Sequence, residues 1–419
     1  MFGIPKGFQR SSMSDRTKIL SVFYEMGWAG DESRTLSMIE TMDRNRFEHM
    51  VLTVLDMRAE DDLIGFHDRE RQYEQSGART RRLSKEMPER ELNLGGLAGK
   101  LYGKTRVLRR ARRLAMFARR WRADVIDART AANLVGVLAG KIAGIPSCIT
   151  LYHGPQHFGE AAWHWTTSLA VRLADRVLTD SKIRGEEFRA HLSRNKDKVV
   201  VIPNGIPQPK SQYGPEQARK VLGLPEDPAI RIIGQVGRII APKGQTDFLH
   251  AARKILDQEP NVSFLIVGHG SDQSYRALLR KLVSDLGLGD KVRMVSYPGP
   301  IGDVWAAIDI HVHASLFDSQ PIAVVEGMSL GKPAVVTSVG GVPEMVEHGR
   351  TGLIVPPADP AAMAAAVLDI LKDPVLMRNL SQAARRRYEK NHRPELMARQ
   401  LEQVFAELTA GARHAGPRL

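Results

Sequence analysis

The chain has 419 residues, of which 43% are apolar and 26% are charged. A single hydrophobic core stops growing at roughly 250–300 residues, so this length predicts two domains and excludes a small module. Cys148 is the only cysteine, which excludes an intramolecular disulfide and a cysteine cage around zinc or an iron–sulfur cluster. We therefore expect a globular protein in a reducing, cytoplasmic compartment.

The net charge of +13 is unevenly divided along the chain. Residues 1–210 carry 36 Lys and Arg against 25 Asp and Glu, which leaves +11, whereas residues 211–419 carry 24 against 22, which leaves +2. Such an excess in one half indicates an anionic partner: a nucleic acid, a membrane surface or a phosphorylated substrate. No apolar run reaches the roughly 18 residues of a membrane-spanning helix.

The first half of the chain alternates short β-branched runs with amphipathic stretches. Residues 1–16 are polar and predict a flexible tail. The runs that predict strands are residues 18–24, 48–56, 125–127, 147–152, 176–179 and 199–202. Strands that alternate with helices need crossover connections, which indicates a mainly parallel, doubly wound α/β sheet. We assign residues 17–205 to this domain.

Prolines and glycines then interrupt the pattern up to Pro215, and a second series of the same kind follows. Its predicted strands are residues 231–237, 262–267, 292–295, 308–313, 334–336 and 352–355. We assign residues 206–385 to a second doubly wound domain and residues 386–419 to a C-terminal helix and tail. Ligands of such sheets bind beyond the carboxyl ends of the strands, so a cleft between the domains is the expected site.

The common nucleotide and metal motifs are absent. Gly268-His269-Gly270 lacks the third glycine of a dinucleotide fingerprint, and Gly331-Lys332 is followed by Pro333 rather than by the Ser or Thr of a P-loop. No Asp-x-Asp pair, which many metal-dependent sugar transferases use to hold a diphosphate, occurs anywhere. We expect no metal and no cofactor.

Two histidines share one face of a predicted strand. His311 and His313 are two residues apart, so they are candidates for a metal pair. No further ligand stands at a recognisable spacing, and packed histidines are the favoured alternative.

The most informative stretch is residues 314–333. Pro321 stands where a helix can begin, so the free amides of Ile322 and Ala323 would form an anion-binding spot. Asp318 and Glu326 flank that spot. Because two carboxylates would repel a phosphate, we expect them to bind hydroxyls of a ribose or a sugar. The alternative is a helix-capping Asp and a surface Glu.

A second basic element follows the strand predicted at residues 231–237. Arg238 and Lys243 lie five residues apart in a loop, next to Gly237 and Gly244. A guanidinium fork and an ammonium point charge suit a diphosphate clamp that needs no metal. Two solvated loop cations are the alternative.

Taken together, these motifs resemble those of the retaining nucleotide-sugar glycosyltransferases of group 1, which have the two-domain GT-B fold. The matching stretches are Gly237-Arg238, Lys243-Gly244, residues 315–321, Glu326, residues 330–334, residues 340–344 and residues 352–354. The weaker counterparts in the first half are residues 27–30, His153-Gly154, Asp180-Ser181 and residues 203–205. The resemblance covers roughly residues 18–408 and implies two Rossmann-like domains that face each other across a cleft.

The resemblance also implies roles for the C-terminal residues. Arg238 and Lys243 would stabilise the departing nucleotide diphosphate. Asp318 would act at the reacting face of the donor sugar, and Glu326 would accept hydrogen bonds from the ribose hydroxyls. The residues whose backbone would meet the phosphates and the sugar are Ser319, Gln320, Ile322 and Ala323. The chain departs from the family pattern here, since Asp318-Ser319-Gln320 replaces the usual Glu-Gly-Phe, and this leaves the donor sugar open.

The counterparts in the N-terminal half carry two further expectations. Gly27 and Gly30 would let the first loop close on the diphosphate, although Gly30-Asp31 departs from the commoner glycine pair. His153 would hydrogen-bond the transferred sugar, or else it is a histidine that packs in its loop.

The implied reaction is metal-independent transfer of a sugar from a nucleotide-diphosphate sugar, with UDP or GDP expected, to an acceptor hydroxyl with retained configuration. This is a hexosyltransferase-type activity. Another GT-B activity, epimerase or phosphorylase, is the alternative. A nucleic-acid partner is disfavoured, because no recognition motif occurs and the basic stretch lacks interleaved stacking aromatics.

That basic stretch begins at Lys100, ends at Arg122 and contains ten Lys or Arg. Helical periodicity predicts an apolar arc and an opposite arc of arginines. The apolar arc is Val107, Leu108, Ala111, Leu114, Ala115, Ala118 and Trp121, and the basic arc is Arg106, Arg109, Arg110, Arg112, Arg113, Arg119 and Arg120. Two interpretations stay open: a solvated helix over the sheet, or a helix that docks on anionic lipid at the inner face of a membrane. We therefore expect the acceptor to be a carbohydrate, a lipid-linked molecule or a small molecule.

Overall fold

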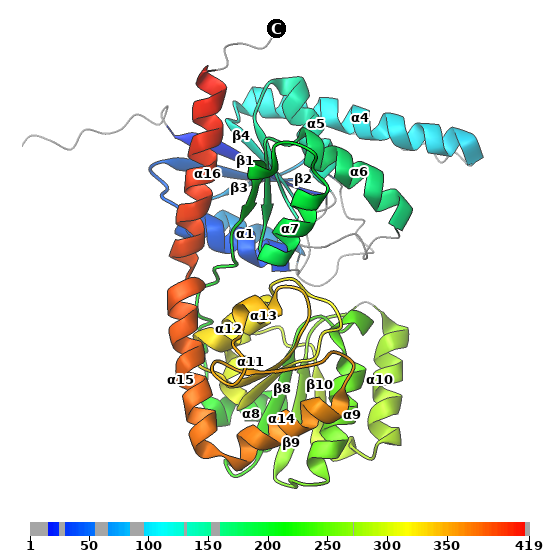
Figure 1. The fold of residues 1–419 in the computed structure, drawn as a ribbon, viewed down its shortest axis with the longest axis vertical. Helices are drawn as coiled ribbons and strands as arrows, with labels where there is room; N and C mark the ends of the chain where they lie inside the picture. Colours follow the sequence, from blue (N-terminus) through cyan, green and yellow to red (C-terminus); the bar gives the residue numbers. More distant parts are fainter. Residues whose placement is uncertain are drawn as a thin grey trace, which may run out of the picture.

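The computed structural model describes residues 16–24, 30–54, 66–83, 96–129, 132–151, 160–270 and 272–414. These residues form two α/β domains, one above the other in Figure 1, and the strands of each sheet are parallel. The prediction of two Rossmann-like, doubly wound domains is thereby confirmed.

The N-terminal domain has a seven-stranded sheet in the order β3-β2-β1-β4-β5-β6-β7. Its strands are β1 (Thr17–Phe23), β2 (Phe47–Thr53), β3 (Arg79–Arg82), β4 (Val125–Arg129), β5 (Ser147–Thr150), β6 (Arg176–Thr179) and β7 (Val199–Val201). Its helices are α1 (Gly30–Thr41), α2 (Phe66–Gln75), α4 (Gly96–Trp121), α5 (Asn133–Ala143), α6 (Glu160–Leu173), α7 (Lys182–Ala190) and the 3₁₀ turn η4 (Lys196–Lys198). The chain order reverses between β1 and β4, so a crevice opens there at the carboxyl ends of the strands.

The C-terminal domain has a six-stranded sheet in the order β10-β9-β8-β11-β12-β13. Its strands are β8 (Arg231–Val236), β9 (Val262–Val267), β10 (Val292–Val295), β11 (Ile310–His313), β12 (Ala334–Thr337) and β13 (Leu353–Val355). The helices around it are α8 (Pro215–Leu222), α9 (Gln245–Leu256), α10 (Gln273–Asp285), α11 (Ile301–Ala307), α12 (Ile322–Ser329), α13 (Val342–Met345) and α14 (Pro360–Lys372), with 3₁₀ turns η5 (Ala241–Lys243) and η6 (Gly289–Lys291). Here the order reverses between β8 and β11.

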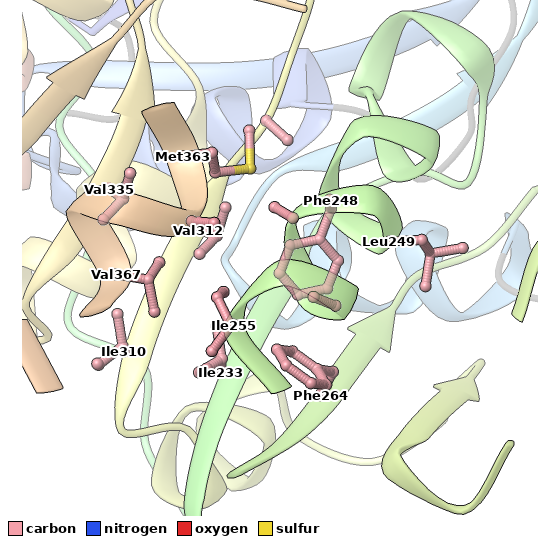
Figure 2. Packing of buried hydrophobic residues seen from close by; sticks show 14 of the residues in the cluster. Ile233, Phe248, Leu249, Ile255, Phe264, Ile310, Val312, Val335, Met363 and Val367 are labelled. Carbon is pink, nitrogen blue, oxygen red and sulfur yellow. The ribbon is translucent and has the colours of Figure 1, made fainter. Parts of the chain in front are cut away.

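One layer of the core of the C-terminal domain lies between its sheet and the helices α9 and α14. Figure 2 shows Phe248 of α9 beside Phe264 of β9 and Val367 of α14 beside Ile310 of β11. The rings of Phe248 and Phe264 meet edge to face at 6.0 Å between centroids. Fully burying one such side chain stabilises the fold by about 1.5–3 kcal/mol, so this layer fixes the strands whose ends carry the candidate site.

Two helices at the end of the described chain connect the domains. α15 (Pro374–Asn391) packs against α12 in the C-terminal domain. α16 (Pro394–His414) then crosses back to the N-terminal domain, where Met397, Leu401 and Phe405 join its core. In Figure 1 the two helices run along one side of both domains. The segment predicted as a C-terminal helix thus completes the hydrophobic core of the other domain.

The basic helix α4 packs on α5 over the N-terminal sheet. The predicted arcs are wrong at two positions: Arg110 is buried and donates a hydrogen bond of 2.7 Å to the hydroxyl of Tyr24, and Leu108 is 42% exposed. The cation also lies over the Tyr24 ring at 5.6 Å, a contact that periodicity along one helix does not reveal.

Across the described ranges, none of the helices combines the length and the apolar character that crossing a membrane requires.

Candidate functional site

The centre of the candidate site is an ion pair between Lys243 and Asp318. Lys243 ends the turn that follows β8, and Asp318 lies in the loop between β11 and α12. β8 and β11 are the two strands between which the sheet order reverses. Ligands of doubly wound sheets bind at this point, beyond the carboxyl ends of the strands.

A glycine lets these two loops touch. Gly244, next to Lys243, has φ +65°, in the left-handed region that favours glycine. A Cβ built on it would lie 2.0 Å from the carbonyl oxygen of Ala314, which follows β11. The backbone of the first loop therefore rests on that of the second and brings the ammonium group onto the carboxylate.

The carboxylate of Asp318 is largely enclosed and has four polar neighbours, one of which is the amide of Ser319 at 3.2 Å. Besides Lys243, it lies 3.2 Å from Nε2 of His313 and accepts a hydrogen bond of 3.3 Å from the hydroxyl of Ser315. Burial would raise its pKa, but Lys243 and His313 hold the pKa of Asp318 well below its usual range. The group is therefore ionised at neutral pH. It does not cap a helix, since the N-cap of α12 is Pro321, so the interpretation of Asp318 as a capping residue is wrong.

The two histidines of β11 are packed in the protein interior. His311 is fully buried and meets Trp305 of α11 edge to face at 5.0 Å, and burial lowers its pKa to about 3. Burial also lowers the pKa of His313, although Asp318 opposes the shift. Both rings are therefore neutral at pH 7, and we assign the Nε2 hydrogen of His313 to Asp318. Within the described ranges, no group of three or more His, Cys, Asp or Glu is arranged to hold a metal ion.

Glu326 in the middle of α12 is partly buried rather than a free surface group. The indole Nε1 of the fully buried Trp305 donates a hydrogen bond of 3.0 Å to its Oε2. Burial raises the pKa of Glu326 to about 7, while the bond from Trp305 opposes that shift. The carboxylate is thus oriented by one hydrogen bond and has acceptor capacity left on its other oxygen.

Arg238 lies in the same loop as Lys243 but is exposed. Its carbonyl accepts a hydrogen bond of 2.8 Å from Nε2 of Gln245, which anchors the loop to α9. Among the residues that the structure describes, no hydrogen bond or ion pair of its guanidinium is found. A fixed backbone and an exposed fork of donors suit an anion that arrives from solvent.

The first turns of two helices meet between the domains. Ile322 and Ala323 begin α12, and neither amide has a hydrogen-bond acceptor in the described part of the chain. Gly30 begins α1 of the other domain, and a Cβ built on it would lie 3.4 Å from Cδ1 of Ile322. Two positive helix ends therefore face the same space, an arrangement that favours an anionic ligand.

The side chains of Ser319 and Gln320 lie between the domains. Ser319 donates a hydrogen bond to the carboxylate of Asp180, and Gln320 accepts two hydrogen bonds, of 2.8 and 3.0 Å, from Asn204. Gly27 and His153 lie outside the described residues. The structure thus brings Lys243 against Asp318, which lies in the loop before α12, with Arg238 in the same loop as Lys243 and Glu326 one turn into α12.

The sequence-based prediction missed two residues that make hydrogen bonds near the candidate site. Trp305 orients Glu326 from another helix, and Glu344 accepts hydrogen bonds of 2.8 and 2.9 Å from the amides of Lys182 and Ile183 at the start of α7. The only signal for Glu344 was its place in the Gly340 to Glu344 motif, and nothing in the sequence pointed to Trp305.

Comparison with known proteins places both halves of the chain. Residues 215–387 match the family model of glycosyl transferases group 1, and residues 30–205 match that of the glycosyl transferase 4-like domain. Together the two models cover residues 30–387 apart from the linker 206–214.

Among curated relatives, the chain is 32% identical over 232 residues to D-inositol 3-phosphate glycosyltransferase of Streptomyces avermitilis, covering 52% of this chain and 49% of the relative. It is 25% identical over 317 residues to glycogen synthase of Mycobacterium tuberculosis, covering 72% and 73%. The chain thus spans about half the length of the first of these relatives. Among solved structures, it is similar to Anabaena HepE in complex with UDP and glucose, with a TM-score of 0.77 and 22% identity over 93% of this chain and 100% of that one.

Proposed function

The chain belongs to the glycosyl transferases of group 1, and we propose that it transfers a sugar from a nucleotide-diphosphate sugar to an acceptor hydroxyl with retained configuration. One observation carries the proposal: Lys243 and Asp318 meet where the strand order reverses, beside the first amides of α12. A diphosphate and a sugar need cations and a hydroxyl acceptor at such a place. UDP is the favoured nucleotide and GDP the second candidate, since the similar HepE structure contains UDP.

The departing diphosphate is the group whose charge grows in the transition state. Arg238 offers an exposed fork of donors, and Lys243 is already held in position by Asp318. The free amides of Ile322 and Ala323 add the positive end of α12. Donors that are fixed before the reaction stabilise developing charge without reorganisation, which is the largest contribution in many enzymes.

The carboxylates then bind the neutral parts of the donor. Asp318 is ionised and accepts hydrogen bonds from hydroxyls of the donor sugar. Glu326, oriented by Trp305, accepts from the ribose hydroxyls. Hydroxyls are the expected targets of both groups because a phosphate would be repelled.

Retention requires that the acceptor attacks the face of the anomeric carbon from which the diphosphate leaves. In this route the acceptor oxygen forms the new bond as the bond to the diphosphate breaks, and a diphosphate oxygen takes the acceptor proton. The positive groups Arg238 and Lys243 supply the charge stabilisation that a metal provides in other transferases, so the proposed reaction needs no metal.

The direct test starts from binding. UDP-, GDP- and ADP-sugars are screened for an increase in melting temperature, because a ligand that binds only the folded state must stabilise it. Candidate acceptors are then supplied with the best donor, and the anomeric configuration of the product is read by NMR with EDTA present. Turnover of the donor without any acceptor would favour the epimerase or phosphorylase alternative, and an inverted product would overturn retention.

We propose in addition that the acceptor is borne by an anionic membrane surface to which α4 docks. The outer face of α4 carries exposed Arg109, Arg112 and Arg120, and two exposed apolar side chains, Leu108 at 42% and Met116 at 53%, lie among them. Basic residues near anionic headgroups contribute about 1 kcal/mol each, and apolar side chains between them suit the interface.

The membrane proposal is tested by co-sedimentation with vesicles of phosphatidylcholine with or without phosphatidylglycerol. The triple variant Arg109→Glu, Arg112→Glu and Arg120→Glu should lose at least about tenfold in binding to acidic vesicles. The control makes the same charge change at exposed Lys220, Lys254 and Arg280 of the C-terminal domain. Equal binding by both variants would end this proposal.

A further inference from the structure

Five buried polar residues from the two domains form one hydrogen-bonded cluster, which we name the interdomain latch. Its members are Asp180, Ser181 and Asn204 of the N-terminal domain and Ser319 and Gln320 of the C-terminal domain. Asp180 accepts hydrogen bonds from the hydroxyl of Ser319 and from the amide of Gln320, the second at 3.3 Å. The hydroxyls of Ser181 and Ser319 are 3.0 Å apart.

The second half of the latch joins Gln320 to Asn204. Nδ2 of Asn204 donates to the carbonyl of Gln320 at 2.8 Å, and the amide of Asn204 donates to Oε1 of Gln320 at 3.0 Å. The carbonyl of Asn204 also lies 3.0 Å from Nδ1 of His392, at the junction of α15 and α16. The latch therefore connects the β11–α12 loop to the segment where the chain passes between the domains.

Every member of the latch is at most 6% exposed. A buried polar group without a partner is costly, so such groups are nearly always paired. Here the carboxylate of Asp180 finds partners on Ser319 and Gln320 in the other domain, and Gln320 in turn finds its partner in Asn204. The carboxylate of Asp180 and the side-chain oxygen of Gln320 have these partners only while the two domains are in contact, so the bonds favour that contact.

The residues on both sides of Asp318 in the chain contact the N-terminal domain. Ser319 and Gln320 follow it directly, and Phe317 precedes it and lies under the guanidinium of Arg184 of α7 at 4.8 Å. Both sides of Asp318 therefore contact the N-terminal domain, while its own carboxylate contacts Lys243 of the C-terminal domain. The backbone position of Asp318 depends on domain contact.

The latch depends on residues in which this chain departs from its family pattern. The usual Gly-Phe at positions 319 and 320 has neither a hydroxyl for Asp180 nor an amide oxygen for the backbone of Asn204. Gly341 gives the latch its space, since a Cβ built on it would lie 2.6 Å from Cβ of Ser181 and 2.7 Å from the carbonyl oxygen of Ser319.

We infer that Asp180 is a positioning residue: by holding Ser319 and Gln320 it places Asp318 against Lys243, so that formation of the donor site is coupled to contact between the domains. This inference rests on the proposed glycosyl transfer. Asp180 acts through the loop, not on the donor.

Hydrogen exchange on the ligand-free protein tests the coupling without any turnover. Asp180→Asn and the milder Ser319→Ala should each raise the exchange rate of the Gln320 and Asn204 amides by at least about tenfold, as expected for loss of a hydrogen bond to a charged group. Ser263→Ala is the matched control, because Ser263 is equally buried and its hydroxyl donates to the carbonyl of Lys291 within the C-terminal domain. The double variant should exchange no faster than the faster single variant. Cooperative urea unfolding of Ser319→Ala verifies that the fold persists.

Kinetics supply the second readout once a donor is known. A protein whose binding-competent state is less populated binds more weakly in proportion, so both latch variants should raise the donor KM several-fold while kcat stays within about twofold. Exchange and KM equal to those of Ser263→Ala would overturn the inference while leaving the transferase proposal intact. Faster exchange in a protein that transfers no sugar would support the latch as a closing contact and sink the proposed function together with the role of Asp180 in it.

Discussion

Lys243 and Asp318 are 75 residues apart in the chain, yet their side chains form an ion pair at the reversal of strand order between β8 and β11. The pair is mostly buried, with 20% and 13% of the two side chains exposed. A buried charge whose partner is removed is strongly destabilising, because the desolvation cost remains without compensation. The pair therefore connects the donor chemistry to the stability of the domain.

Lys243→Met should lower the free energy of unfolding at pH 7 by about 3 kcal/mol. The reason is that Asp318 then stays buried and ionised with only neutral partners. Urea titration measures the change. Adding Asp318→Asn to Lys243→Met should recover part of that loss, although we expect both variants to lose the proposed transferase activity. A double variant less stable than Lys243→Met alone would contradict this account of the pair.

Glu326→Gln should change how stability depends on pH. Burial raises the pKa of Glu326 from 4.5 to about 7, so its folded state binds more protons than the unfolded state between those values, and its contribution to stability falls as pH rises through that window. Glutamine does not titrate. The free energy of unfolding of the variant, relative to that of the wild type, should therefore rise by up to about 3 kcal/mol between pH 4.5 and 7.5. The rise should be smaller in so far as the side chain is exposed.

Urea unfolding at those two pH values measures this difference. Glu216→Gln, at an exposed position in the first turn of α8, is the control for the chemical change from Glu to Gln. Trp305→Phe removes the hydrogen bond that lowers the pKa of Glu326, so it should extend the window of declining stability to higher pH. A shift to lower pH would refute the assigned role of Trp305.

Gly244→Ala should disrupt the candidate site through the backbone. The new Cβ would both occupy a left-handed conformation and meet the carbonyl of Ala314 at 2.0 Å. Gly287→Ala separates the two effects, since Gly287 has φ +62° and no atom within 4 Å of a built Cβ. We expect about 1 kcal/mol of lost stability for Gly287→Ala and at least about 2 kcal/mol more for Gly244→Ala, with loss of donor binding. Thermal unfolding measures the loss of stability, and nucleotide titration measures donor binding. Equal losses of stability in the two variants would mean that the loops of Gly244 and Ala314 can move apart at little cost.

Phe405→Ala should destabilise the N-terminal domain although Phe405 belongs to the last helix described. Phe405 is fully buried beside Met397 and Leu401 in the core of that domain. Truncation of a buried Phe costs about 3–5 kcal/mol, and hydrogen exchange should show the loss in α1 and β4, the elements that α16 contacts. Gln403→Ala, exposed on the same helix, should change stability by less than about 0.5 kcal/mol. An effect confined to α16 would show that the helix is not part of that core.

Local pattern predicted most of the fold. Twelve of the strands appeared as β-branched runs, with ends that differ by up to three residues. β3 was missed because Arg79–Arg82 is an edge strand with only Thr80 buried, so alternation of apolar residues is absent. Edge strands of polar sequence carry little signal.

The sequence alone did not predict contacts between residues that are far apart in the chain. The motifs identified Lys243 and Asp318 as candidate site residues. Predicting the ion pair between them would have required the order of the strands in the sheet. The bond from Ser319 to Asp180 joins residues 139 positions apart, and Arg110 was misplaced because its partner Tyr24 lies on another element. Periodicity reports which face of an element is apolar, and it is silent about polar partners that other elements bring.

The return of α16 to the N-terminal domain has a consequence for biogenesis. Residues 17–201 leave the ribosome before residues 394–414, so the first domain emerges with an uncovered apolar surface on α1 and β4, against which α16 later packs. Domains generally fold in order from the N-terminus during synthesis. The core of this N-terminal domain, however, is completed only when α16 has been made. A released chain that ends at residue 390 would contain the strands of both sheets but lack α16, so its N-terminal domain is expected to remain incompletely packed.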